Sequence, residues 1–535
     1  MAVIAPQTDV YLLKVPLEID SINQLTFANA TAQSNYFNSL PKLSVYDFTY
    51  QRKDSTIRFG ANFDDIVSYN YVMYRNEAYS NKWFYAYIDK MEYLNDSVTA
   101  ISIKTDVFQT WQFDLTYKQT FVEREHVNDD TIGAHTINEG LDMGEYVINT
   151  STTLKPNKTV KDEDDHTINW IYPIVFQTTE IPGDLHEAVN YYSREYNGVF
   201  SGLYYFACMS ITQARLVLDY YNSEGVGKGN AIKAIFLAPK EFFNGAKVVS
   251  GGGKTIYIPA DSTSLSTLLD ATTVSRPTTV NGYTPKNNKL FTYPYSYIYA
   301  TNNTGVDTTF RYEDFANATP KFFMAGALGQ GCTVKLCPVS YKNYTANAEV
   351  FEYGLTGAKY PICAWATDYY TNWMTQNATN LNVGVVSGIA SAGITSLSGN
   401  YVGAGASLLS TIGSTMAQID AAKVQPDQAR GNTNSSDVLI AWQRYFTIDC
   451  MSVRAEVART IDDFFTMFGY KVNRVKIPNI TGRRNWNYVK TIGCYIDADI
   501  PQEDLQEIKN MFDNGVTFWH NPSTFADYSQ NNDII

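Results

Sequence analysis

The segment from Tyr369 to Ile419 contains no charged side chain in 51 consecutive residues. Because 18% of the whole chain is charged, roughly nine charges would be expected in a segment of this length. Apolar residues recur in it at helical spacing on both sides of Ser398–Asn400, which predicts two short helices joined by a turn. The large apolar side chains of this segment are Val383, Val385, Val386, Ile389, Ile394, Leu397, Leu408, Leu409, Ile412 and Met416.

The predicted helical hairpin has the dimensions of a bilayer. A helix of ~20 residues is about 30 Å long, close to the thickness of the hydrocarbon core. The pairs Gly384/Gly388 and Gly399/Gly403 permit close approach of two helices. Two interpretations remain open on these residues, a hairpin that meets lipid and a glycine-rich hairpin buried in an ordinary protein interface. No run of about 18 strongly apolar residues occurs, so a conventional transmembrane helix is not predicted.

The rest of the chain is rich in residues that favour strands. Its 535 residues include 40 Tyr, 28 Phe and 8 Trp, which suit pleated, half-buried surfaces. Residues 82–93 and 97–108 flank a short turn and predict a hairpin of two long aromatic strands. Alternating apolar residues from Ile57 to Phe63 predict another strand. We therefore predict a mainly β fold with α+β parts, in which residues 1–150 form a β-barrel or sandwich domain.

Three further parts are expected. Residues 151–368 are of mixed character and form one or more middle domains, with a loop tip at Ser250–Thr255, whose SGGGKT lacks the first glycine of a phosphate-binding loop. Residues 369–436 contain the uncharged hairpin and a polar linker. Residues 437–535 form an α+β domain with one helix ending before Gly469 and another ending before Gly515.

No catalytic or metal-binding constellation stands out. The five histidines show no HExxH spacing, no GxSxG elbow occurs, and none of the six cysteines forms a CxxC pair. We predict a protein that is not an enzyme and has no cofactor or metal, with mostly free thiols made in a reducing cytoplasm. The first residues, MAVIAPQTDVYLLK, lack the regions of a signal peptide. The net charge of −13 argues against binding to nucleic acid by counterion release.

Three sets of charged residues could serve catalysis or binding, and each also has a structural interpretation. Glu123–His126 could act in general acid–base chemistry, but we expect a solvated or interface ion-pair cluster. The adjacent carboxylates Asp64/Asp65 and Asp462/Asp463 could suggest glycoside hydrolysis. Asp64 and Asp65 are a poor pair, because neighbours on a strand point to opposite faces. A basic run with interleaved aromatic residues could contact nucleic acid, although a solvated sheet face or a subunit interface suits the acidic chain better. This run contains Lys471, Arg474, Lys476, Arg483, Arg484 and Lys490, with Tyr470, Trp486 and Tyr488.

Three segments together resemble the distal tail knob proteins of phi29-like short-tailed bacteriophages. The first extends from Asn81 to Asp130 and includes NKWFYAYIDKMEY, TDVFQTW and VEREHVNDD. The second extends from Phe464 to His520 and includes FFTMFGYKVNRVKIPNITGRRNWNYVKT and QEDLQEIKNMFDNGVTFWH. The third is the uncharged hairpin that precedes this C-terminal part. The resemblance covers both ends of the chain and the order of its parts, roughly half of the sequence.

The resemblance implies a homo-hexameric tube at the tip of the tail, built from β-barrel tube domains like those of other tail hubs. A hydrophobic loop, which maps to about 377–423 here, would plug the lumen and then insert into the host membrane. The ten apolar side chains named above would be its membrane-active residues. The implied partners are other copies of the chain, the upper tail tube and collar, the host membrane, and double-stranded DNA that passes without sequence-specific binding. The protein would be made in the host cytoplasm and act at the host envelope.

Two other functions remain as alternatives. A tail-associated cell-wall hydrolase would need a carboxylate or metal site that the sequence does not display. A receptor-binding protein could use an aromatic cluster such as Tyr293–Tyr297 to bind sugar, although such clusters more often form sheet surfaces or interfaces.

Overall fold

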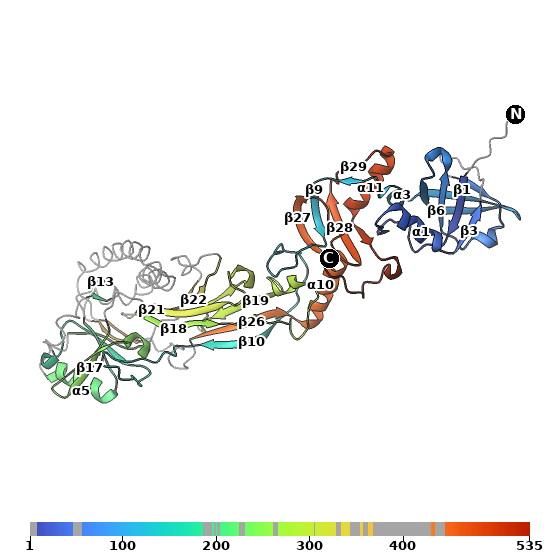
Figure 1. The fold of residues 1–535 in the computed structure, drawn as a ribbon. Helices are drawn as coiled ribbons and strands as arrows, with labels where there is room; N and C mark the ends of the chain where they lie inside the picture. The colour runs from blue at the N-terminus through green and yellow to red at the C-terminus, as the bar shows by residue number, and fades with distance from the viewer. Residues whose placement is uncertain are drawn as a thin grey trace. The chain divides into compact units, whose positions relative to one another are not determined.

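The computed structural model describes residues 8–45, 56–185, 195–196, 199–200, 204–223, 231–260, 266–303, 305–327, 333–342, 354–356, 362–366, 430–433 and 445–535. These residues belong to two compact units, which we describe separately. Unit 1 comprises residues 1–142, 285–290 and 456–535, and unit 2 comprises residues 143–284 and 291–455. The two ends of the chain therefore contribute to the same unit, as the blue and the orange to red parts of Figure 1.

The first sheet of unit 1 has six strands in the order β3-β1-β5-β6-β7-β4, and every neighbouring pair is antiparallel. Its central strands are buried on both faces, since Tyr71 and Met73 of β5 enter one core cluster while Val72 and Tyr74 enter another. The pairing of β6 with β7 confirms the predicted aromatic hairpin. The strands are β1 (Thr8–Leu13), β3 (Lys42–Val45), β4 (Thr56–Phe59), β5 (Tyr71–Asn76), β6 (Trp83–Asn95) and β7 (Val98–Thr105).

Two strands predicted in this region are shorter than expected, because helix caps end them. The strand from Ile57 stops at Phe59, and Asn62 then caps helix α2 (Phe63–Ile66) by accepting the N–H of Asp64. Asp64 and Asp65 are therefore exposed residues of a helical first turn and are not on a strand. Likewise, Asp106 ends β7 and caps α3 (Val107–Trp111).

The second sheet of unit 1 combines strands from both ends of the chain. Its order is β2-β30-β28-β9-β27, with β2 and β30 parallel and the other pairs antiparallel. In Figure 1 the cyan strand β9 lies between β27 and β28. The strands are β2 (Asn23–Leu25), β9 (Thr120–Glu125), β27 (Tyr470–Lys476), β28 (Trp486–Ile492) and β30 (Val516–Trp519). A short pair, β8 (Thr116–Tyr117) and β29 (Ile496–Asp497), accompanies it.

Three longer helices complete unit 1, namely α1 (Ala30–Ser39), α10 (Ala455–Phe468) and α11 (Gln502–Asn514). Both C-terminal helices were predicted, and both stop at glycines in positive φ, Gly469 and Gly515. At Gly469 a Cβ atom would lie 2.2 Å from the carbonyl oxygen of Glu125, so only glycine fits there. The buried face of α10 includes two polar residues, Asp462 and Thr466, beside apolar ones such as Ile461.

Unit 2 contains three larger sheets and helix α5 (Ile211–Ser223). The first sheet has the order β10-β26-β19-β20. Its members are β10 (Tyr146–Leu154), β26 (Phe446–Val453), β19 (Ser296–Thr301) and β20 (Asp307–Phe310). Strand β10 crosses the domain boundary predicted at residue 150, and β26 lies after the boundary predicted at residue 437. Both strands belong to unit 2.

The other two sheets have the orders β16-β17-β14-β11-β15-β24-β25 and β18-β21-β22-β23. The tip between β16 and β17 carries the SGGGKT sequence, which confirms the predicted loop tip. The strands of the larger sheet are β11 (Ile174–Thr178), β14 (Tyr204–Cys208), β15 (Ile232–Leu237), β16 (Lys247–Gly251), β17 (Lys254–Ile258), β24 (Ile362–Ala366) and β25 (Arg430–Thr433). The others are β18 (Ser266–Thr273), β21 (Lys321–Ala327), β22 (Thr333–Val339) and β23 (Leu355–Thr356), with a separate pair β12 (Glu195–Tyr196) and β13 (Val199–Phe200).

Candidate functional site

A buried polar cluster in unit 1 holds the short segment 285–290, which joins two stretches of unit 2 along the chain. Asn287, Asn288 and Lys289 each bind a different carboxylate. We call these three residues and their carboxylates the polar anchor. Its first carboxylate is Asp462 of α10, which accepts the backbone N–H groups of Lys286 (2.7 Å) and Asn287 (3.0 Å) and the side-chain amide of Asn287 (2.9 Å).

The second carboxylate of the anchor is Asp130. It accepts the backbone N–H of Asn288 at 3.0 Å, while the Asn288 amide donates to the Asp130 carbonyl at 2.8 Å. The Tyr470 hydroxyl donates to the other oxygen of the carboxylate. Burial raises the pKa of Asp130. The hydrogen bonds from the Asn288 N–H and the Tyr470 hydroxyl oppose that rise, because they favour the ionised carboxylate.

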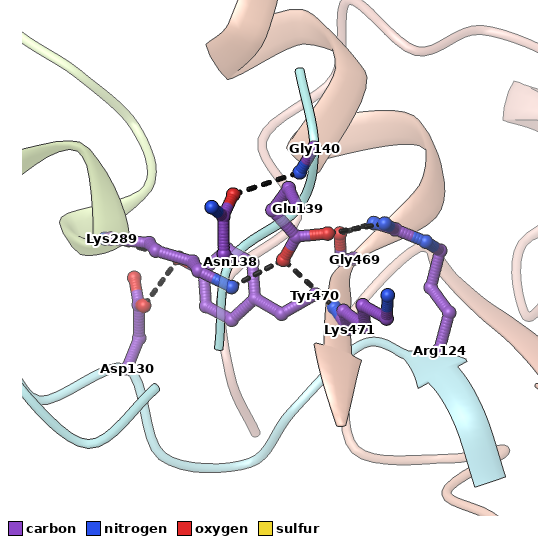
Figure 2. Close-up of polar contacts among 9 residues, drawn as sticks. All are labelled: Arg124, Asp130, Asn138, Glu139, Gly140, Lys289, Gly469, Tyr470 and Lys471. Atoms are coloured by element: carbon purple, nitrogen blue, oxygen red, sulfur yellow. Dashed lines mark hydrogen bonds and ion pairs between the residues drawn. The ribbon is translucent and has the colours of Figure 1, made fainter. Parts of the chain in front are cut away.

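The third carboxylate is Glu139, which Figure 2 shows between the Lys289 ammonium group and the Arg124 guanidinium group. The Glu139 side chain is fully buried, and those of Lys289 and Arg124 are 2% and 13% exposed. The backbone N–H of Lys471 also donates to Glu139 at 2.9 Å. Burial lowers the pKa of Lys289, and Glu139 opposes this shift. One buried carboxylate therefore serves two cations, which makes the anchor depend strongly on its charge.

Local turns present Glu139 to both cations. The Asn138 side chain accepts the Gly140 N–H at 2.9 Å, and this turn places Glu139 at its centre, as Figure 2 shows. Arg124 is fixed from the other side, because it also donates to the carbonyl of Gly469 at 2.8 Å. The groups come from β9, the loop after it, the segment 285–290 and the start of β27. Sequence patterns could not reveal this convergence, because no two of these parts are neighbours along the chain except β9 and its loop.

The cluster Glu123–His126 forms ion pairs, as we expected, but Glu125 and His126 are not solvated. Glu125 and His126 are buried, because β9 lies inside its sheet. Glu125 forms an ion pair with Lys476 and accepts the Asn479 N–H at 2.9 Å. His126 accepts the N–H of Tyr488 through Nδ1 at 2.7 Å and donates from Nε2 to the carbonyl of Thr466 at 3.1 Å. Both ring nitrogens are thus used by the neutral form.

Burial, with a smaller effect of Arg483, lowers the pKa of His126 to about 3. In the unfolded chain His126 takes up a proton near pH 6.5, but in the folded chain it stays neutral until about pH 3. Its contribution to the free energy of unfolding is therefore fully present above pH 6.5 and is lost as the pH falls from 6.5 towards 3. We expect His126→Gln, which keeps an acceptor and a donor but does not titrate, to be less sensitive to acid than the wild type. Between pH 7 and pH 5 the wild type should lose ~2 kcal/mol more, as measured by urea unfolding.

Two comparisons make this prediction specific. His520, whose pKa burial lowers to about 4, is present in both proteins and gives both the same residual slope. His166→Gln is the surface control and should change the free energy of unfolding at pH 7 by less than about 0.5 kcal/mol, because that side chain is 78% exposed. Parallel curves for the wild type and His126→Gln would show that the His126 environment does not contribute.

The basic run from Lys471 to Lys490 does not form a platform for stacking bases. Its three aromatic residues, Tyr470, Trp486 and Tyr488, are buried, and Arg483 is 8% exposed. Arg483 lines a cavity of about 200 Å³ together with His126, Asp130 and the C-terminal residues 530–534. Its guanidinium donates to the carbonyls of Val127 (3.1 Å) and Asn532 (3.2 Å), so it fixes the C-terminal segment.

Other predicted features have varied outcomes. Asp462 is buried in the anchor and Asp463 is exposed, so they do not form a catalytic pair. Tyr295 of the aromatic cluster is fully buried, and Tyr297 packs on Tyr146.

Among the described residues, no group of three His, Cys, Asp or Glu side chains could hold a metal ion. Within that same part of the chain, the buried cysteines 208, 337, 450 and 494 are free.

The predicted plug residues, from Val383 to Met416, lie outside the described residues. Strands β24 and β25, which come before and after them, are described and pair antiparallel, with Ala366 opposite Arg430. Strand β25 is at the edge of its sheet. A search of the described helices finds none with the length and apolar character needed to cross a membrane.

Comparison with known proteins decides the family. The family model for the C-terminal domain of the tail knob protein gp9 of Bacillus phage phi29 matches residues 262–533, just over half of the chain. The chain belongs to this tail knob family. A model of the caudoviral major tail protein N-terminus matches residues 6–116. The protein is therefore a structural tail knob protein of a phage tail, which assembles with other tail proteins.

Relatives match along nearly the whole chain. The tail knob proteins gp9 of Bacillus phages phi29 and PZA are 27% and 26% identical, each over 98% of this chain and 98% of the relative. The solved structure of the bacteriophage C1 tail knob protein gp12 is similar in fold, with a TM-score of 0.64 and 13% identity, covering 99% of this chain and 100% of that one. The predicted fold class, mainly β with α+β parts, is confirmed.

Proposed function

We propose that this chain forms the distal tail tube as a homo-hexameric ring, with a loop at about 377–423 that plugs the lumen. On infection the loop would insert into the host membrane and open a path for the genome. In this proposal residues 1–150 and 437–535 form most of the tube wall, and residues 151–368 form the middle part. The union of β2 and β9 with β27, β28 and β30 in one sheet supports a wall made from both ends of the chain.

The observation that carries the proposal is the position of the uncharged segment in the chain. Strand β24 ends at Ala366 and β25 begins at Arg430, and these two residues face each other across a strand pair. Residues 367–429 are therefore inserted between two paired strands, of which β25 is the edge strand of the sheet. In this proposal the plug leaves the lumen while the pair of β24 and β25 stays formed.

The energetics of transfer favour the same role. A charged side chain at the centre of a bilayer costs ~3 kcal/mol, and the segment from Tyr369 to Ile419 has none. Glycine-rich helices are marginal in water, so several copies packed together in a lumen would be only moderately stable. Release from the ring would then exchange contacts between copies for contacts with lipid.

The charge of the whole chain suits a conduit for DNA. A chain of net charge −13 repels a phosphate backbone on balance, which in this proposal lets a duplex pass without being held. This passage would be independent of base sequence. The proposed partners are therefore other copies of the chain, the upper tail tube and collar, the host membrane and the passing DNA. After synthesis in the host cytoplasm, the assembled knob would act at the envelope of the next host.

A peptide spanning residues 377–423 should release a trapped dye from lipid vesicles. The same peptide with Ile389→Asp and Ile394→Asp is the control, and it should release little dye, because each buried carboxylate costs ~3 kcal/mol. Fluorescence dequenching measures the release. Vesicles that stay intact at a high ratio of the unaltered peptide to lipid would contradict the membrane role.

A further inference from the structure

Residues 530–535 lie along the chain that leads into strand β28 and bind it through hydrogen bonds. We call these six residues the strap. Ile534 forms a β-bridge with Arg483. Beside this bridge the N–H of Arg484 donates to the carbonyl of Asp533 at 3.0 Å. The strap therefore binds unit 1 mainly through its backbone, as an added strand does.

Asn532 makes most of the side-chain contacts of the strap. Its Oδ1 atom accepts the N–H groups of Asn485 (3.0 Å) and Trp486 (3.1 Å). Its side-chain amide donates to the Trp486 carbonyl at 2.8 Å. One side chain thus supplies three hydrogen bonds to two successive residues of unit 1, and its loss should loosen the strap.

The strap contributes little to the apolar core. None of its six side chains is buried, and Ile534 and Ile535 are 37% and 81% exposed. By contrast, Val72 and Met73 in the central strand β5 are fully buried. Segments with few buried apolar contacts open at a lower free energy than the core, so we expect the strap to open while the sheets of unit 1 stay folded.

The cavity of about 200 Å³ places the strap next to the polar anchor. Residues 530–534 line this cavity together with Asp130 and Asn287 of the anchor. Asn287 is 7% exposed, so the folded strap helps to keep water away from it. When the strap opens, water can compete for the hydrogen bonds by which Asp130 and Asp462 hold segment 285–290.

We propose that the strap is a lid on the polar anchor, and that its local opening releases segment 285–290 while the sheets of unit 1 remain folded. The hydrogen bonds of Asn532 keep the lid closed. Because segment 285–290 joins two stretches of unit 2 along the chain, the lid controls whether this connection is bound in unit 1. The inference does not depend on the proposed function, since every contact that carries it lies within unit 1.

Hydrogen exchange of the wild-type chain gives the first test. The N–H groups of Asn287 and Asn288, which bind Asp462 and Asp130, should exchange at least roughly tenfold faster than those of β5. Mass spectrometry of peptides that cover these segments measures the rates. Equal protection of segment 285–290 and β5 would overturn the lid, because the anchor would then open only when the whole unit unfolds.

Trypsin provides the second test, because Lys289 is 4% exposed and its ammonium group binds Glu139. The bond after Lys289 can be cut only when the segment has left the anchor. Asn532→Ala should speed this cut roughly tenfold or more, since cleavage follows the population of the open form. The cut after Arg75 in β5, which reports unfolding of the first sheet, should keep its wild-type rate.

Asn531→Ala is the matched control for Asn532→Ala. The Asn531 amide donates to Asp533 within the strap at 2.7 Å, and its carbonyl, which accepts the Asn485 amide, is unchanged in the variant. This variant should be cut like the wild type. A chain that ends at Ser529 has no strap and should be cut after Lys289 at least as fast as Asn532→Ala.

The two cuts distinguish a lid from a general stabilising contact. A wild-type rate of cleavage after Lys289 in both Asn532→Ala and the shortened chain would overturn the proposal. An equal acceleration of the cuts after Lys289 and Arg75 would also overturn it, because the strap would then stabilise the whole unit. Thermal unfolding checks that each variant is folded before the protease is added.

Discussion

Glu139→Gln should lower the free energy of unfolding of unit 1 by about 3–5 kcal/mol, the largest effect of any single substitution considered for the folded units. Glutamine keeps the size of the side chain and one acceptor oxygen, but it removes the negative charge that the buried Lys289 and Arg124 share. Two cations would then face each other in a site with little water. Denaturant unfolding followed by the fluorescence of the buried Trp486 and Trp519 measures the loss.

The control for this prediction is an ion pair of the same unit at the surface. Glu92 lies 3.5 Å from Lys90, and the two side chains are 63% and 68% exposed. Glu92→Gln should change the stability by less than about 1 kcal/mol, because water screens the pair. If Glu139→Gln were as mild as Glu92→Gln, the polar anchor would not stabilise unit 1, and segment 285–290 would have to be held by the Asp462 and Asp130 contacts alone.

Phage that carry Ile389→Asp and Ile394→Asp in this protein should assemble and adsorb normally but deliver their genome poorly. Two carboxylates add ~6 kcal/mol per chain to the cost of entering the bilayer, enough to abolish insertion. Transfer of labelled DNA into host cells, normalised to adsorbed particles, measures delivery. We expect a reduction of at least roughly 100-fold.

The matched control uses two isoleucines outside the loop. Ile148 and Ile211 in unit 2 are each 55% exposed, so Ile148→Asp with Ile211→Asp adds the same charge without placing it in the uncharged segment. These particles should deliver DNA normally. Equal delivery by the loop variant and the control would mean that entry does not need this apolar surface, and the plug proposal would fail.

The parts of the fold that the sequence predicted are those set by local patterns. The hairpin of β6 and β7 follows from alternating apolar residues and a short turn, and α10 and α11 follow from helical spacing that ends at glycine. Errors arose where one capping residue overrides a pattern. Asn62 and Asp106 each begin a helix within a stretch whose alternation predicts a strand.

The candidate site could not be predicted, because it depends on contacts between distant parts of the chain. Glu139 is separated from Lys289 by 150 residues, and Lys471 is 332 residues away from it. No local pattern distinguishes Glu139 from other acidic loop residues. The same reason explains the error at Glu125 and His126, since a strand that is rich in charged residues becomes buried only when β27 and β28 pair on both of its sides.

The sheet that joins β2 and β9 to β27, β28 and β30 also sets an order of events during synthesis. The ribosome makes β2 and β9 early. Strand β9 gains its neighbours when β27 and β28 have emerged, and β2 gains its neighbour only when the last of these strands, Val516–Trp519, has emerged. Until then β2 has no strand to join, and the second sheet of unit 1 stays incomplete while the chain is being synthesised. A chain that stops before β30 therefore lacks a complete unit 1.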